Sequence, residues 1–173
     1  SRVLRSRNVD SSSRLALSVA LAQTRLAYNC SVWPPLTKRE KTKWSTKYIA
    51  RVRGAGGTFN NKLRRWTDDQ ALTVAKCVSP AELLWRSRLR YMWRVIQTAP
   101  AQLFGLFAAD AEAGGGYTSM LAVDWAWLCL QLCQTKVAIM DTRLEAAAPF
   151  LLGISRRAWK KRIAKSEKIC ILK

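Results

Sequence analysis

The sequence predicts an all-α protein of six to eight helices, and three observations support this fold class. Apolar residues recur at helical spacing along most of the chain, whereas the alternation typical of strands is nearly absent. Capping-box patterns mark several helix starts. Proline and glycine residues fall between the periodic segments, where they favour turns and helix ends.

The first predicted helix lies within residues 13–29. Four apolar residues recur there at helical spacing: Leu15, Val19, Ala22 and Leu26. The chain then reaches Trp33-Pro34-Pro35, and we expect the helix to end before it because proline cannot continue a helix. Residues 1–29 are rich in Arg and Ser, as an organellar transit peptide is, but we favour a basic arm followed by a helix.

Three later helices are predicted from capping boxes, in which Ser or Thr precedes Glu or Gln by three positions. The pairs are Thr37 with Glu40, Thr67 with Gln70, and Ser79 with Glu82. Pro80 follows the third cap directly, at the first helical position, where its missing N–H costs nothing.

Two glycine runs divide the chain, at Gly54-Ala55-Gly56-Gly57 and at Gly114-Gly115-Gly116. Because glycine favours turns, we predict flexible joints there, although both runs are short enough to be loops within one domain. The resulting parts are a basic N-terminal arm with the first helices (1–53), a central helical pair with an arginine face (58–112), and C-terminal helices with a basic tail (117–173).

The charge of the chain is strongly unbalanced: 30 Lys and Arg stand against 11 Asp and Glu, for a net charge of +19. Much of this charge must be exposed, because an unpaired cation is costly to bury. A polyanion relieves the mutual repulsion and gains affinity by releasing its counterions. Nucleic acid is therefore the first partner that the composition predicts, and an anionic membrane surface is the second.

Catalytic and metal-binding patterns are poor. The chain has no histidine, which excludes Ser-His and Cys-His nucleophile pairs and zinc sites with histidine ligands. Trp66-Thr67-Asp68-Asp69 is similar to the metal-binding Tyr-x-Asp-Asp of polymerases, but it opens a predicted helix, where acids complement the macrodipole. We therefore expect no catalytic residue, no metal and no cofactor.

The five cysteines are odd in number and widely spaced, which argues against a secreted disulfide framework. We expect reduced, mostly buried thiols, and no secretory signal is visible. These observations predict an organellar (mitochondrion favoured) or nuclear protein that is not secreted.

The segment 80–99 predicts an amphipathic helix with an arginine face. Trp85, Leu89, Met92 and Ile96 share one face, and Arg86, Arg90 and Arg94 share another. Successive arginines would stand about 6 Å apart along the axis, close to the spacing of phosphates along a strand. We expect these three residues to contact phosphates, against the alternative of an ordinary solvated face.

Two further basic runs are candidate contacts. The first includes Lys43, Lys47 and Arg51, with Trp44 and Tyr48 among them. These aromatic residues either stack on bases or pack with Val52 as a helical stripe, and we favour the packed stripe. The second run contains four cations opposite Trp159 and Ile163 on a predicted short amphipathic helix: Arg156, Arg157, Lys160 and Lys161.

Residues 118–140 are the most apolar segment, but Asp124 interrupts them. Because a carboxylate is costly in lipid, we favour a buried helix over a membrane span. The alternative function that follows from a membrane span is that of an accessory subunit of an energy-converting membrane complex.

Six short segments, in order and spacing, carry a resemblance that covers most of residues 14–130: LALSVA (15–20), RLAY (25–28), VWPPLT (32–37), RLRY (88–91), APAQLF (99–104) and VDWAWL (123–128). Together they resemble the thumb and downstream region of reverse transcriptases from non-LTR (LINE-type) retrotransposons. The resemblance implies a thumb-like helical bundle with basic extensions, whose 37–53 and 80–99 helices contact the backbone of a template–product duplex. The fingers, the palm and the catalytic aspartates of that family are absent from this sequence.

We therefore expect a non-catalytic protein that binds the backbone of RNA or an RNA–DNA duplex, with RNA favoured. The expected context is a structural subunit of a ribonucleoprotein such as an organellar ribosome, in contact with neighbouring proteins of a larger assembly. Two alternatives to this function stay open: the accessory subunit of a membrane complex named above, and a fragment of a reverse transcriptase.

Overall fold

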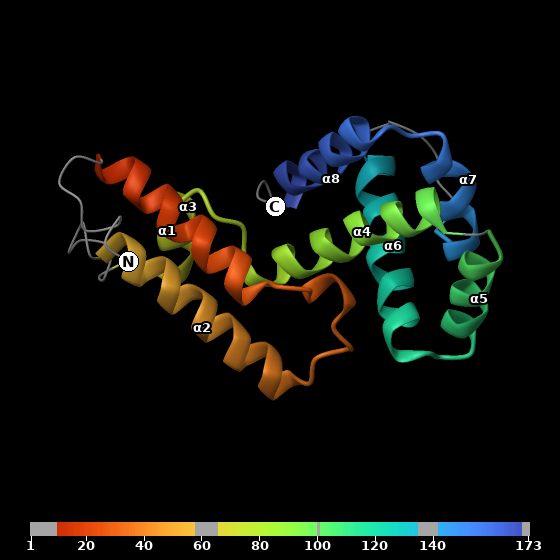
Figure 1. Ribbon diagram of the computed structural model, residues 1–173, viewed down its shortest axis with the longest axis horizontal. Helices are drawn as coiled ribbons and strands as arrows, with labels where there is room; N and C mark the ends of the chain where they lie inside the picture. Colours follow the sequence, from red (N-terminus) through yellow and green to blue (C-terminus); the bar gives the residue numbers. More distant parts are fainter. Residues whose placement is uncertain (1–9, 58–65, 100, 135–141, 171–173) are drawn as a thin grey trace. The chain divides into compact units, whose positions relative to one another are not determined.

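The computed structural model describes residues 10–57, 66–99, 101–134 and 142–170, and within them the chain is all-α, with eight α-helices and no strand (Figure 1). The predicted fold class is thus confirmed. Contacts divide the described residues into two compact units rather than along the three parts that the glycine runs delimit. Unit 1 is built from residues of Ser1–Cys30 and Leu36–Leu84, and unit 2 from residues of Ser31–Pro35 and Trp85–Lys173.

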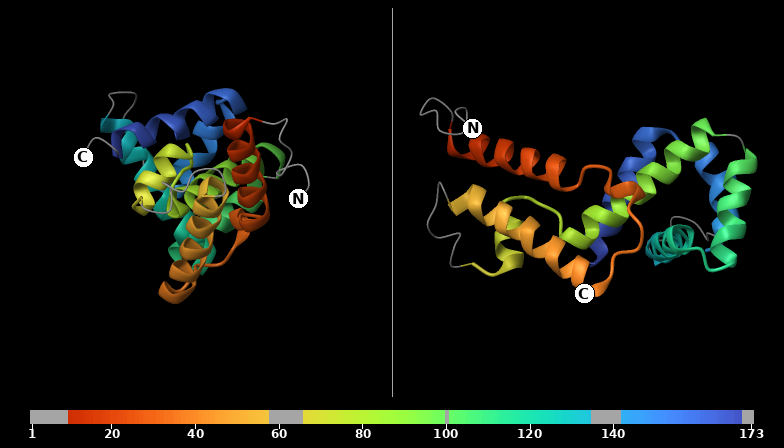
Figure 2. Two further views of the ribbon diagram at one scale, coloured as in Figure 1. Left: turned by 90° about the vertical axis from the view of Figure 1, so that its left-hand side faces the viewer. Right: turned by 60° about the horizontal axis from the view of Figure 1, so that its bottom comes forward.

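Unit 1 consists of α1 (Ser11–Leu26), α2 (Lys38–Gly57), α3 (Asp68–Val74) and the first residues of α4 (Pro80–Thr98). Helices α1 and α2 lie side by side and run in opposite directions (Figures 1 and 2). The Gln23 amide on α1 donates a hydrogen bond to the Tyr48 hydroxyl on α2, over 2.9 Å. The core of the unit is formed by three buried side chains: Tyr48, Val52 and Leu72.

Unit 2 contains the rest of α4 together with α5 (Ala101–Glu112), α6 (Gly116–Gln134), α7 (Ala147–Leu152) and α8 (Arg156–Cys170). A short 3₁₀ turn, η4 (Leu144–Ala146), precedes α7, and η2 (Cys30–Val32) lies where the chain passes from one unit to the other. The core is rich in aromatic and aliphatic side chains, among them Leu89, Met92, Trp125, Leu128, Leu151, Trp159 and Ile163.

All three predicted capping boxes are present. The Thr37 N–H donates to Glu40 Oε2 over 2.9 Å, and the Glu40 N–H donates to Thr37 Oγ1 over 3.3 Å. The same reciprocal pair of bonds joins Thr67 to Gln70 and Ser79 to Glu82. Each box satisfies N–H groups that the first helical turn leaves without a partner, which is why α2, α3 and α4 begin where they do.

The two glycine runs behave differently. The prediction of a joint at Gly54 was wrong, because α2 continues through Gly57. Gly114 does end a helix: it has a φ of +83° and donates to the Ala111 carbonyl while Gly115 donates to the Asp110 carbonyl, which is a Schellman ending of α5. Glycine lowers helix propensity without forbidding a helix, so only the second run produces a turn.

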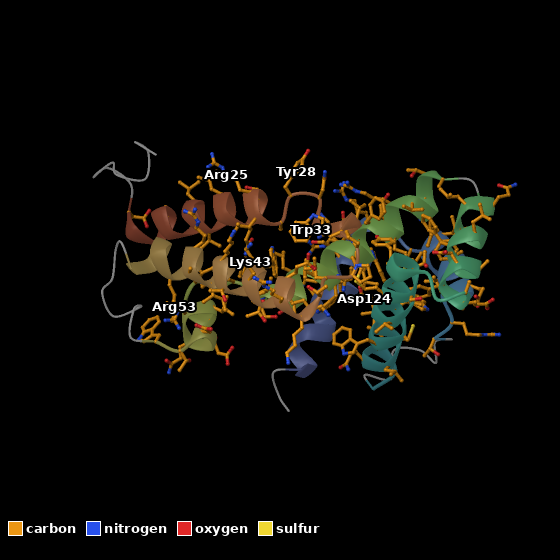
Figure 3. All side chains as sticks on the ribbon, turned by 90° about the horizontal axis from the view of Figure 1, so that it is seen from below. Arg25, Tyr28, Trp33, Lys43, Arg53 and Asp124 are labelled. Carbon is orange, nitrogen blue, oxygen red and sulfur yellow. The ribbon has the colours of Figure 1, made fainter. Side chains whose placement is uncertain are left out.

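The apolar segment 118–140 forms a packed helix over its described part. Leu121, Trp125, Leu128 and Leu132 on α6 are buried in the unit 2 core, and residues 135–141 lie outside the described residues. Among the described helices, none is both long enough and apolar enough to cross a membrane. Asp124 on α6 (Figure 3) is buried and paired with Arg88 of α4.

The buried Tyr48 and the half-buried Tyr117 make alkaline pH a probe of both units. Burial raises the pKa of Tyr48 to about 12, although the hydrogen bond from Gln23 opposes the change. Burial is also the main cause that raises the pKa of Tyr117 in unit 2 to about 12. A raised folded-state pKa means that the stability from each hydroxyl is fully present below about pH 10 and is lost as the pH rises through 12.

Alkaline titration of the folded protein, followed by phenolate absorbance, is therefore expected to show a late phase near pH 12. Tyr48→Phe and Tyr117→Phe should each remove part of that phase. A titration that is complete near the ordinary tyrosine pKa of about 10 would contradict the burial of these two hydroxyls.

Candidate nucleic-acid interface

Helix α2 carries its buried residues and a row of exposed cations on different faces. Tyr48 and Val52 are buried, and Trp44 is half-buried beside them. A different face, roughly a third of a turn away, presents four cations at successive i, i+4 positions, which we call the α2 ladder: Arg39, Lys43, Lys47 and Arg51. All four side chains are exposed, and the ladder extends over about 18 Å of helix axis because each residue rises 1.5 Å.

Little negative charge from the described residues offsets the ladder. Glu40, the only acid in α2, accepts from both the N–H and the hydroxyl of Thr37, over 2.9 and 2.8 Å. The backbone hydrogen bond first, and then the hydroxyl, lower the pKa of Glu40, so this carboxylate stays ionised in its capping role. Asp68 of α3 pairs instead with Arg53, which lies outside the ladder (Figure 3).

The aromatic residues of α2 point away from the ladder, as the packed-stripe interpretation predicted. The rings of Trp44 and Tyr48 are stacked with their centroids 5.6 Å apart. Trp44 Nε1 donates to the Leu26 carbonyl over 3.4 Å, and the Tyr48 hydroxyl donates to the Val78 carbonyl over 3.1 Å. Both rings are therefore used for folding, and the α2 ladder offers charge without a stacking surface.

The arginine face of α4 has two exposed members instead of the three expected. Leu89, Met92 and Ile96 are buried as predicted, and Arg90 and Arg94 are exposed. Arg86 differs, because its Nε and Nη2 atoms are buried. Its guanidinium carbon lies 6.0 Å from the centroid of the Trp85 ring.

Arg86 is half-buried and lies beside a packed pair of tryptophans. The neighbouring Trp85 ring packs against Trp127 of α6, with centroids 4.7 Å apart. With two of its nitrogens buried, Arg86 presents less of its guanidinium than the prediction that it points outward with Arg90 and Arg94 requires.

Periodicity alone did not identify the arginine of α4 that forms an ion pair with α6. Arg88 donates from Nε and Nη2 to the two carboxylate oxygens of Asp124, and the Nη2–Oδ1 distance is 2.9 Å. Burial raises the pKa of Asp124, while the hydrogen bonds and charge of Arg88 act in the opposite direction. The available signal was the single acid within the apolar segment, which required a cation on a neighbouring helix.

Helix α8 carries the third group of predicted contacts. Four exposed cations, which we call the α8 cluster, lie on its outer side: Arg156, Arg157, Lys160 and Lys161. Together with Ala164 they line an open depression of about 550 Å³. Trp159 and Ile163 on the same helix are buried, as the amphipathic pattern predicted.

The described residues contain no group of three or more Cys, Asp or Glu side chains that could hold a metal ion. Asp68 and Asp69 lie in the first turn of α3, behind the Thr67 cap. Cys30 and Cys77 are free thiols, and Cys30 and Cys129 are buried.

Comparison with known proteins adds no relative: no family model, no curated protein and no solved structure matches this chain. The resemblance to the reverse transcriptase thumb therefore stays a prediction that depends on the sequence segments quoted above.

Proposed function

We propose that this protein binds the phosphate backbone of RNA or of an RNA–DNA duplex without catalysing a reaction, as a structural subunit of a ribonucleoprotein. The observation that carries the proposal is the α2 ladder. Its four cations are exposed along one straight helix face, and the buried stripe holds that face outward.

The chemistry of the ladder suits phosphates rather than bases. Lys and Arg attract phosphate by charge, and Arg can also donate two parallel hydrogen bonds to it. Such contacts position a nucleic acid without reading its sequence. Arg90 and Arg94 of α4 and the α8 cluster add exposed positive charge, which favours association with any polyanion.

Replacing all four ladder residues with Gln is expected to weaken binding of an RNA duplex and to flatten its salt dependence. Each lost phosphate contact makes the slope of log K against log salt less negative by about 0.7–0.9, so the slope of the variant should be shallower by about 3. Fluorescence anisotropy at several salt concentrations measures this change. Helix content by circular dichroism checks that the variant folds.

A matched control removes the same charge elsewhere in unit 1. Arg25, Lys38, Lys41 and Lys76 are also exposed but lie outside the ladder, and their replacement by Gln changes the net charge equally. The control variant should keep most of the wild-type slope. Equal slopes for the two variants would show that net charge, and not the α2 ladder, determines binding.

A second candidate function is attachment to other proteins or to lipid through α6. Val123 and Leu130 lie seven residues apart on one face of this helix and are 68% and 55% exposed. Such a face suits a subunit with apolar neighbours, including the accessory subunit of a membrane complex. Copurification of the chain with RNA, or with detergent-solubilised membrane, would decide between the two candidates.

A further inference from the structure

We propose that the α8 cluster is a separate binding site for a compact polyphosphate, meaning a ligand that holds several phosphate groups close together. This site lies in unit 2, whereas the α2 ladder lies in unit 1. It does not depend on nucleic acid binding along α2, and it adds a different class of ligand to the proposed function.

The rotation of α8 about its own axis is set by its buried side. Trp159 is 1% exposed, and its Nε1 donates to the Leu89 carbonyl of α4 over 3.2 Å. Ile163, one turn later, is completely buried. The guanidinium carbon of Arg162 lies over the Phe150 ring, 4.9 Å from its centroid. These contacts hold the α8 cluster on the outer side.

The shape of the cluster favours a compact ligand. Its cations fall within six consecutive residues, which span about 8 Å of helix axis, against about 18 Å for the α2 ladder. Ala164 projects between them on the helical projection, and its small side chain leaves room for the open depression. The depression is open to solvent, so a ligand would be held there by the four cations rather than by enclosure.

The described residues leave the positive charge of the cluster unbalanced. The first turn of α8 contains no acid, although the macrodipole would favour one there. Within the described part of the chain, the four cations have no ion-pair partner. A ligand with several negative charges would relieve this repulsion, and the two arginines can each donate paired hydrogen bonds to its oxygens.

An extended strand and a compact polyphosphate make different demands. A nucleic acid strand distributes its phosphates along a line, which matches the row of cations in the α2 ladder. Inorganic triphosphate, or a small molecule with clustered phosphates, concentrates its charge in one place, which matches four cations around a depression. The ligand class is therefore assigned from the arrangement of the cations and not from their number.

The test is calorimetric titration of the full chain with inorganic triphosphate at physiological salt. The wild type should bind one triphosphate with highest affinity at the α8 cluster. Arg156→Gln/Arg157→Gln/Lys160→Gln/Lys161→Gln should weaken that binding by about tenfold or more, since each tenfold loss corresponds to loss of only one or two good contacts. The four-Gln variant of the α2 ladder, with the same net charge, should bind triphosphate within about twofold of the wild type.

Two results would overturn the site: unchanged triphosphate affinity in the α8 variant, or equal losses in the α8 and α2 variants. Competition with an RNA duplex identifies the source of the phosphates. Displacement of triphosphate by RNA would indicate that phosphates of nucleic acid occupy the cluster, which would overturn its assignment to a compact ligand, whereas simultaneous binding of both would support a separate site for a small polyphosphate. The RNA salt slope of the α2 variant is measured independently, so failure of the proposed function is distinguishable from failure of this site.

Discussion

Asp124→Ala is expected to lower the free energy of unfolding by about 3–5 kcal/mol, which is the usual effect of removing one partner of a buried ion pair. Both partners are 11% exposed, and the carboxylate accepts from two nitrogens of Arg88. Removing it leaves a guanidinium in the interior of unit 2 without its anion. Urea denaturation measures the change from the shift of the midpoint.

The double variant Arg88→Met/Asp124→Leu is expected to recover most of that loss. Burial raises the pKa of Asp124 in spite of Arg88. A folded-state pKa above the unfolded value means that this group stabilises the fold most below its ordinary pKa, and that the contribution is lost as the pH rises through the raised value. At neutral pH the ionised pair is therefore costly to bury, and an apolar pair of similar volume can replace it.

The matched control for this cycle is Glu112→Ala, an exposed acid of α5 whose loss should change stability by less than about 0.5 kcal/mol. If the double variant is as unstable as Asp124→Ala alone, the ion pair contributes more than its burial costs. That result would contradict the expectation that an apolar pair can replace the ion pair.

Trp159→Ala is the second change with a large expected effect, a loss of about 3–5 kcal/mol in the free energy of unfolding. The indole is nearly inaccessible and packs in a cluster with two aromatic neighbours, with ring centroids 6.4 Å from Trp125 and 6.5 Å from Phe150. Truncation leaves a cavity in the core and removes the hydrogen bond to the Leu89 carbonyl. Urea denaturation again supplies the measurement.

Trp159→Phe separates packing from hydrogen bonding, because it keeps an aromatic ring but not the N–H donor. Its loss should be smaller than that of the Ala variant, since much of the ring volume remains. Lys160→Ala, on the exposed side of the same helix, should change stability by less than about 0.5 kcal/mol. A Trp159→Ala variant with wild-type stability would contradict the packing of α8 described above.

The features that the sequence predicted well are those whose causes are local. A capping box satisfies N–H groups within one helical turn, so Thr37, Thr67 and Ser79 could be assigned from a few neighbours each. The buried stripes of α2 and α4 follow from side-chain periodicity in the same way. The joint expected at Gly54 was wrong because glycine imposes a modest helix penalty that a well-capped helix can overcome.

The sequence by itself determined that the chain is helical, where three of its helices begin and which of their faces are apolar, because these properties depend on residues within a few positions of one another. Only the tertiary structure decided which arginines are available to a ligand. Arg88 forms an ion pair with an acid 36 residues away. Two guanidinium nitrogens of Arg86, which lies beside a tryptophan pair, are buried, whereas Arg90 is exposed. The environment of a charge depends on distant segments that fold against it, and periodicity along one helix contains no information about them.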